Sequence, residues 1–311
     1  MSAAGLALLP LTLVRAAGPA KVPVLIDTDV GDEMDDAFAL ALALVSPELD
    51  VCGITTVAGD AWARALIVCR LLQEAGREAV PVAAGRPRRE APDRKGQFAY
   101  GHLPGLRKRP VGESAVEFLY ARLKARPGEL TLVALGPLTN VAELFARRPD
   151  CKPWVKRLVV MGGSVRVGYN GKPPPEPEWN VKSDVKAAQA VFAAGVPLLV
   201  VPVDAAVGLE LDAPLRRRVF GARTPLTEQL QALYRLSERP TPTLFDPLAV
   251  ALCFDERWCK FEALCLEVDG KGMTRVAPGK SNARVAASVR RADFLNWLAG
   301  RLAPGGAKEG R

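Results

Sequence analysis

The chain has 311 residues, 49% of them hydrophobic and 24% charged, which is ordinary for a globular protein and long enough for one large α/β domain. The net charge of +8 comes from scattered Lys and Arg, with only short clusters and no aromatic-rich basic motif. We therefore expect solvated surface charge and no nucleic-acid partner.

We expect the N-terminal segment, residues 1–20, to be signal-like or disordered. Its apolar run GLALLPLTLV is too short to span a bilayer but resembles the core of a secretory signal. The basic residues that normally precede such a core are missing. Export, for example to a periplasm, and a cytoplasmic location both stay open. We expect no membrane span elsewhere in the chain.

Strand and helix patterns alternate along the remaining chain. We predict strands at residues 22–26, 49–57, 80–84, 129–135, 157–161 and 198–203. We predict helices at residues 36–45, 64–75, 114–125, 141–146, 185–194, 247–253 and 292–302. Residues 86–109 and 162–180 are rich in Pro and Gly and are expected to be long loops, the second a functional one. This alternation predicts a mostly parallel sheet with helices on both faces, in a single α/β domain over residues 21–305.

The cysteines carry no metal-binding pattern. The chain has six of them, with no CxxC pair and no His partner at zinc spacing. Several lie inside apolar runs, where Cys behaves as a small hydrophobic residue. We expect structural thiols, and the sequence leaves a disulfide open.

Residues 22–38, VPVLIDTDVGDEMDDAF, are the most informative segment. Five aspartates and Glu33 follow an apolar strand directly, at the strand end where open α/β sheets bind their ligands. Like charges this close repel each other unless a hard cation neutralises them. A solvated acidic loop is the alternative. The apolar flanks on both sides favour a divalent metal site.

Several motifs of the chain resemble those of the nucleoside hydrolases. Asp27-Thr28-Asp29-Val30-Gly31, followed by Asp35-Asp36-Ala37, is similar to that family's DxDxG and DD fingerprint. Further segments match in the family's order: TTVAGD at 55–60, ALGPLTN at 134–140, MGG at 161–163, EWN at 178–180 and FDPLAV at 245–250. The resemblance spans about residues 22 to 250. It implies a Rossmann-like nucleoside hydrolase fold, and an enzyme that hydrolyses the N-glycosidic bond of ribonucleosides.

The resemblance also implies roles for individual residues. It implies a Ca²⁺ cofactor with four protein ligands, namely Asp29, Asp36, Asp246 and the backbone carbonyl of Thr139. Asp29 would in addition be the general base that deprotonates the attacking water. Nucleoside contacts would come from Asp35 at the ribose 2′-hydroxyl, Asn180 beside it, and Glu178 and Asn170 at the 5′-hydroxyl. Asp27 would orient Asp29 without binding the metal. A homo-oligomer is expected.

The sequence departs from the family pattern in three places. The aspartate segment is two residues longer than in the best-known members, which adds Asp32 and Glu33. Asp60 stands where many relatives have Asn. Phe245 stands where many have a histidine thought to protonate the leaving base; it either stacks on the base, which would favour purine nucleosides, or packs in the core. His102, the only histidine, is expected to be incidental.

Two other functions compete with this interpretation. A haloacid-dehalogenase-type phosphatase also opens with a strand and DxD, and a non-catalytic relative could bind calcium or a nucleoside without turnover. Two of the motifs also have structural explanations. GPLTN could simply begin a helix capped by Asn140, and DPLAV could be a helix capped by its own Asp.

Overall fold

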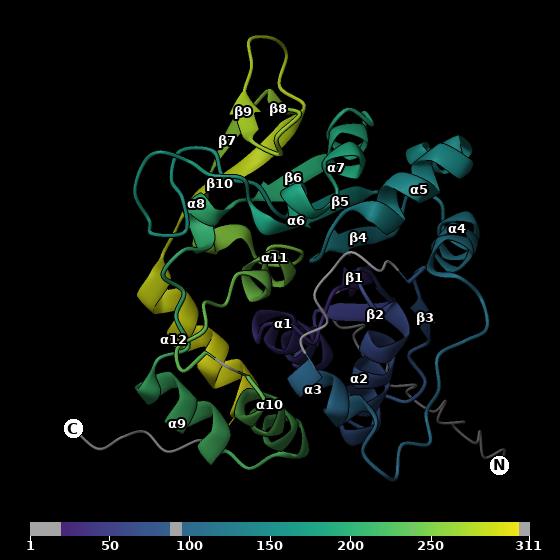
Figure 1. The fold of residues 1–311 in the computed structure, drawn as a ribbon, viewed down its shortest axis with the longest axis vertical. Helices are drawn as coiled ribbons and strands as arrows, with labels where there is room; N and C mark the ends of the chain where they lie inside the picture. Colours follow the sequence, from purple (N-terminus) through teal and green to yellow (C-terminus); the bar gives the residue numbers. More distant parts are fainter. Residues whose placement is uncertain (1–19, 88–94, 238, 305–311) are drawn as a thin grey trace, which may run out of the picture.

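The computed structural model describes residues 20–87, 95–237 and 239–304 (Figure 1). Within these ranges an eight-stranded sheet has the order β3–β2–β1–β4–β5–β6–β10–β7. Neighbouring strands are parallel, except that β7 runs antiparallel to β10. The strands are β1 (Val22–Thr28), β2 (Leu49–Thr56), β3 (Val82–Ala84), β4 (Thr131–Ala134), β5 (Arg157–Met161), β6 (Leu198–Val201), β7 (Cys259–Leu264) and β10 (Ala283–Val289). The predicted mostly parallel sheet is confirmed.

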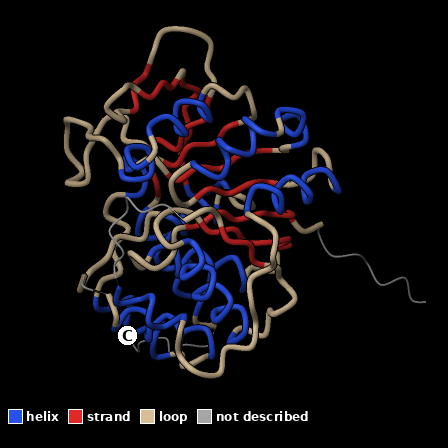
Figure 2. The backbone as a smooth tube through the Cα atoms, turned by 45° about the vertical axis from the view of Figure 1, so that its right-hand side comes forward, coloured by secondary structure: helices blue, strands red, loops and turns tan. Residues whose placement is uncertain are grey.

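Helices cover both faces of this sheet, which forms the central layer in Figure 2. The apolar strands explain this, because successive side chains point to opposite faces. Val24 and Ile26 of β1 belong to one hydrophobic core, and Leu25 belongs to the other. The first core contains α1 (Asp35–Val45), α2 (Ala61–Glu74), α11 (Asp246–Ala251) and α12 (Arg291–Leu302). The second contains α4 (Ala115–Ala125), α5 (Thr139–Arg147) and α7 (Val185–Phe192).

The strand order reverses between β1 and β4. The chain continues from β1 to β2 and β3 on one side, and from β4 to β5 and β6 on the other. Connections that leave in opposite directions open a crevice outside the carboxyl ends of the two central strands. The aspartate segment follows β1 and therefore lies at this crevice.

The remaining elements lie around this framework. They are α3 (Lys95–Gly101), α6 (Trp179–Ser183), α8 (Val203–Ala206), α9 (Ala213–Gly221) and α10 (Pro225–Arg235), the 3₁₀ turns at Pro149–Trp154 and Glu256–Trp258, and a hairpin of β8 (Leu266–Val268) and β9 (Thr274–Val276). The predicted loops at 86–109 and 162–180 are therefore wrong in part, since α3 lies in the first and α6 begins in the second.

No helix of the described residues is long and apolar enough to cross a membrane. The signal-like segment lies outside the described residues, apart from Ala20.

All six cysteines are free thiols in the structure, and Cys69, Cys151 and Cys253 are buried. Burial raises the pKa of the Cys253 thiol to about 12. A buried thiol with a raised pKa is inert as a nucleophile. The three buried cysteines therefore contribute packing, as the sequence predicts.

Candidate active site

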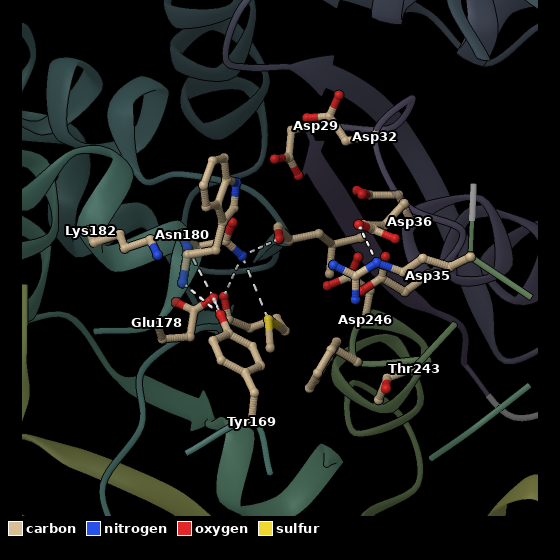
Figure 3. A pocket seen from close by; sticks show the side chains of 16 residues that line it. Asp29, Asp32, Asp35, Asp36, Tyr169, Glu178, Asn180, Lys182, Thr243 and Asp246 are labelled. Atoms are coloured by element: carbon tan, nitrogen blue, oxygen red, sulfur yellow. Dashed lines mark hydrogen bonds and ion pairs between the residues drawn. The ribbon is translucent and has the colours of Figure 1, made fainter. Parts of the chain in front are cut away.

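A pocket of about 510 Å³ opens at the crevice between β1 and β4 (Figure 3). Its volume lies within the range of about 300–1,000 Å³ that is typical of small-molecule sites. Acidic side chains from the start of α1 and α11 form one wall. Glu178, Asn180 and Tyr169 form the wall opposite.

Three buried carboxylates meet on the acidic wall. Asp35 and Asp36 begin α1, Asp246 begins α11, and one oxygen from each lies within 4.8 Å of the others. Burial, followed by the charge of Glu33, raises the pKa of Asp35 to about 8. Burial and the charge of Asp35 raise the pKa of Asp36 to about 7. Buried carboxylates that repel each other in this way fit a hard cation with oxygen ligands.

The helix starts explain how these acids reach the pocket. The residue that caps α11 is Phe245, and no side chain caps the helix, so Asp246 is not the helix cap that the alternative interpretation of DPLAV requires. Its carboxylate meets those of Asp35 and Asp36 instead. The positive ends of both helix dipoles favour negative charge at these positions.

Asp29 lies one residue beyond β1 and lines the same pocket. It is not part of the group of three carboxylates within 4.8 Å. Burial, followed by the charge of Asp36, raises its pKa well above the usual value. Gly136 makes room for it, because a Cβ at position 136 would stand 2.8 Å from Asp29 Oδ1. The hydroxyl of Thr28 donates a hydrogen bond to Asp36, which ties β1 to α1.

Asp27 supports the site from behind. Its Oδ1 accepts hydrogen bonds from Thr55 Oγ1 at 2.6 Å and from Asn140 Nδ2 at 2.8 Å. Burial raises its pKa to about 6. Asn140 also donates to the Thr56 carbonyl at 3.0 Å, so its side chain links the ends of β1 and β2 and does not cap α5. The alternative that GPLTN is only a capped helix start is therefore wrong.

Glu178 and Asn180 are held rigidly on the opposite wall. Glu178 caps α6: its Oε1 accepts from the Asn180 amide at 2.9 Å, and its Oε2 accepts from the Val181 and Gly163 amides at 3.1 Å each. Asn180 Nδ2 donates to the Leu135 carbonyl at 2.6 Å and the Met161 carbonyl at 3.1 Å. Both side chains are buried, and burial raises the pKa of Glu178.

Two predicted site residues lie outside the pocket lining. Thr139 is the first residue of α5, where the helical hydrogen-bond pattern takes up the backbone carbonyl, and its hydroxyl donates to Asp184 at 2.7 Å. Leu135, directly after β4, lines the pocket in its place. Asn170 is exposed, and its Oδ1 accepts from the Lys172 amide at 2.8 Å. The structure supports neither Thr139 as a metal ligand nor Asn170 as a substrate contact.

Aromatic side chains complete the pocket. Phe245 and Tyr169 pack edge to face, with ring centroids 5.9 Å apart. Trp179 also lines the pocket and is 42% exposed. Sequence reasoning missed Tyr169 and Trp179, although they are neighbours of Asn170 and Glu178. A loop fixes which neighbour faces inward, and a motif does not show this.

His102 and Asp60 lie outside the pocket lining, whereas the added residues Asp32 and Glu33 belong to it. The ring of His102 is hydrogen-bonded through Nδ1 to the Phe98 carbonyl at 2.9 Å and is exposed, as expected for an incidental residue. Asp60 caps α2 by accepting from the Ala63 amide at 2.9 Å. Among the described residues that line the pocket, none is a histidine. Any leaving-group acid in the pocket is therefore of another residue type.

Comparison with known proteins identifies the family. Residues 24–296 match the family model described as inosine-uridine preferring nucleoside hydrolase. The chain belongs to this family. It is 33% identical to the pyrimidine-specific ribonucleoside hydrolase RihA of Citrobacter koseri, over 91% of this chain and 98% of that protein.

Solved nucleoside hydrolases share the fold. A plant nucleoside hydrolase superposes with a TM-score of 0.81 at 28% identity, covering 92% of this chain and all of that one (100%). A purine-preferring ribonucleoside hydrolase from Gardnerella vaginalis gives a TM-score of 0.78 at 25% identity, covering 90% and 98%. The chain is thus a nucleoside hydrolase, an enzyme that acts on N-glycosyl bonds, and the phosphatase alternative is wrong.

Proposed function

We propose that this nucleoside hydrolase cleaves ribonucleosides to ribose and free base in a calcium-dependent reaction, with a preference for purine nucleosides. The observation that carries the proposal is the buried cluster of Asp35, Asp36 and Asp246, which faces Glu178 and Asn180 across one pocket. One wall suits a cation and the other suits the hydroxyls of a sugar.

The acidic wall fits calcium by its donor chemistry. Every side chain in the cluster offers carboxylate oxygen, the ligand type that calcium takes in sets of six to eight. Asp36 and Asp246 would hold the ion, with Asp29 beside them. Bound there, a calcium ion would supply positive charge for orienting a water molecule and the ribose diol.

The chain's own groups then account for the reaction. Asp29 takes a proton from the attacking water, whose oxygen forms a bond to C1′ as the C1′–N bond breaks. The base departs with the bonding electron pair and takes up a proton from solvent, and Asp29 returns its own proton to solvent. Asp35 accepts a hydrogen bond from the 2′-hydroxyl. Glu178, buried and fixed by backbone amides, accepts one from the 5′-hydroxyl. Asn180 fixes the ends of β4 and β5, because its Nδ2 donates to the carbonyls of Leu135 and Met161.

The purine preference rests on the aromatic side of the pocket. Phe245 and Tyr169 form a packed pair there, and stacking of a base on an aromatic ring is worth about 1–3 kcal/mol. The larger purine surface gains more from such a contact than a pyrimidine does. With no histidine among the described lining residues, departure of the base would depend more on this stacking.

A reducing-sugar assay with inosine, guanosine and uridine tests both parts of the proposal. We expect hydrolysis with calcium, loss of activity with a chelator, and a higher kcat/KM for the purines. Phe245→Ala should lower kcat/KM for inosine about 5–150-fold, in line with 1–3 kcal/mol of stacking, and lower it less for uridine.

Phe261→Ala provides the matched control, because Phe261 lies half-buried on β7 outside the pocket lining. It should leave the ratio between the two substrates unchanged. Equal losses for inosine and uridine in Phe245→Ala would reduce Phe245 to a packing residue. Higher kcat/KM for uridine in the wild type would overturn the purine preference alone.

A further inference from the structure

A buried arginine is hydrogen-bonded to the segment that carries Asp29. Arg64 belongs to α2, and its side chain is 0% exposed. Its guanidinium donates to the backbone carbonyls of Asp29 and Val30, the latter at 3.1 Å, and its Nε donates to the Ala58 carbonyl at 2.9 Å. Its Nη2 pairs with Asp32 Oδ2 at 2.8 Å. One side chain therefore binds three carbonyls and a carboxylate around the end of β1.

The aromatic ring of Phe98 also packs against this segment. Phe98 of α3 lies against the Arg64 guanidinium, which is 5.2 Å from the ring centroid. Gly31 has a φ of +121°, and a Cβ there would stand 2.7 Å from Phe98 Cε1. Any other residue at position 31 would clash with this ring and strain the backbone. The turn that follows Asp29 thus packs against both Arg64 and Phe98, which together restrict its backbone conformation.

The chemistry of this contact requires arginine. A buried charge is costly unless it is paired and its donors are satisfied. The planar guanidinium places donors in several fixed directions at once, whereas a lysine ammonium is a compact charge on a flexible stem. Asp32, which supplies the countercharge, belongs to the part of the aspartate segment that is longer than in the best-known relatives.

We propose that Arg64 is a positioning residue for the proposed function: with Asp32 as its partner, it fixes the backbone at Asp29 and so holds the Asp29 carboxylate toward the pocket. Arg64 does not line the pocket, whereas Asp29 and Asp32 do. Arg64 therefore acts through the backbone, without touching the substrate.

Arg64→Lys tests this proposal, with Asp32→Asn as a second variant that keeps the arginine. Loss of a group that orients a ligand typically costs about 10–100-fold in metal affinity or activity. We expect Arg64→Lys to lose calcium affinity and kcat by about that factor, with a smaller change in KM. Asp32→Asn should lose less, and the double variant should lose less than the product of the two, because both act on one contact.

Arg157→Lys is the matched control. Arg157 also combines an ion pair, to Glu256 at 2.9 Å, with hydrogen bonds to two carbonyls, those of Leu252 and Cys253. It lies outside the pocket lining. This variant should lower the melting temperature while calcium affinity and kcat stay at wild-type values. Both Arg64→Lys and Arg157→Lys should lose stability. Only a positioning role for Arg64 predicts that calcium affinity and kcat fall in Arg64→Lys and stay unchanged in Arg157→Lys.

Hydrogen exchange of the metal-free proteins separates this inference from the proposed function. We expect the amides of residues 29–34 to exchange faster in Arg64→Lys and Asp32→Asn, and at wild-type rates in Arg157→Lys. Wild-type exchange in all three variants, or unchanged calcium affinity in Arg64→Lys, would overturn the positioning role. A wild type that hydrolyses no ribonucleoside would overturn the proposed function, while the exchange rates would still decide whether Arg64 fixes the segment.

Discussion

At the scale of single residues, a carboxylate at a helix start caps the helix, lines the pocket or, like Glu178, does both. Asp60 and Asp246 both stand at helix starts. Asp60 accepts from the amide of Ala63 and caps α2, whereas Asp246 is the first residue of α11 and is not its cap. The capping acid is exposed and the other is buried. The free carboxylate of Asp246 is thus available for a ligand.

This contrast predicts the effect of Asp246→Asn on calcium binding. Replacing a carboxylate by an amide removes charge and one of the preferred oxygen donors, so we expect calcium affinity, measured by calorimetry, to fall at least about 10-fold. Asp60→Asn removes the same charge but retains a good capping side chain, and it should bind calcium like the wild type. An unchanged dissociation constant in Asp246→Asn would exclude Asp246 from the ligands.

Asp29 can be tested as the general base in the same way. General-base removal typically costs about 10²–10⁴-fold in rate, and Asp29→Asn should lose at least this much of kcat while its melting temperature stays near the wild-type value. Calcium is kept saturating, so that the loss reports on chemistry. A variant that retains more than about a tenth of wild-type kcat would show that another group is the base.

At the scale of elements, the structure of apolar runs bounded by clear turn or capping residues could be predicted from the sequence, and short helices could not. The run of residues 22–26 is buried on both faces, and the helix of residues 36–45 is apolar all round, so their patterns carry their structure. α3 has the sequence KGQFAYG, with two glycines, and depends on packing of Phe98 and Tyr100 into the core. Such tertiary stabilisation leaves no local signal.

The same limit applied to the candidate site. The motifs predicted the acids that line the pocket, because those acids stand at strand ends and helix starts. They did not predict that Leu135 faces the pocket in place of Thr139, which begins α5, or Tyr169 in place of Asn170. Within a turn or loop, the backbone path decides which side chain points inward. Arg64 was missed because its charge sits in an otherwise apolar helix pattern, with its partners 32 to 35 residues earlier or in the preceding loop.

Packing between β2 and α4 gives a prediction at this scale. Gly53 of β2 faces the ring of Phe118, and a Cβ there would lie 2.4 Å from Phe118 Cζ. Phe118 is fully buried and cannot move aside without disturbing the second core. Gly53→Ala should lower the free energy of unfolding by about 1–3 kcal/mol in urea titrations.

Gly112→Ala is the control for this substitution. Gly112 lies exposed just before α4, and a Cβ there would meet no heavy atom within 4 Å. It should be near neutral in the same titration. If Gly53→Ala were as stable as the wild type, β2 and α4 could move apart at little cost. This would contradict the tight packing of Gly53 against Phe118.

At the scale of the whole molecule, the site joins parts of the chain that are far apart in sequence. Asp35 and Asp36 lie near the beginning of the described chain, and Asp246 lies some two hundred residues later, on a helix that packs beside α1. The cluster forms only once the fold brings the two helix starts together. A ligand that binds this cluster therefore binds the folded state and stabilises it, by about 2.7 kcal/mol at a hundred times its dissociation constant.

The stability of the whole molecule should therefore depend on pH in opposite ways with and without calcium. The folded-state pKa values of Asp27, Asp36 and Asp35 are raised from 3.8 to about 6, 7 and 8, chiefly by burial. Between about pH 4 and pH 8 the metal-free folded chain thus holds protons that the unfolded chain has released. Stability falls with rising pH wherever the folded state binds more protons.

We expect the free energy of unfolding, from urea titrations in a chelator, to be lower at about pH 8 than at about pH 5, with the loss spread over the range in which these groups ionise. Saturating calcium should reverse the trend, because it binds the ionised carboxylates and competes with their protons. Asp35→Asn removes the group with the highest of the three pKa values and should flatten the upper part of the metal-free profile. A metal-free protein that is more stable at about pH 8 than at about pH 5 would contradict the raised pKa values of the cluster.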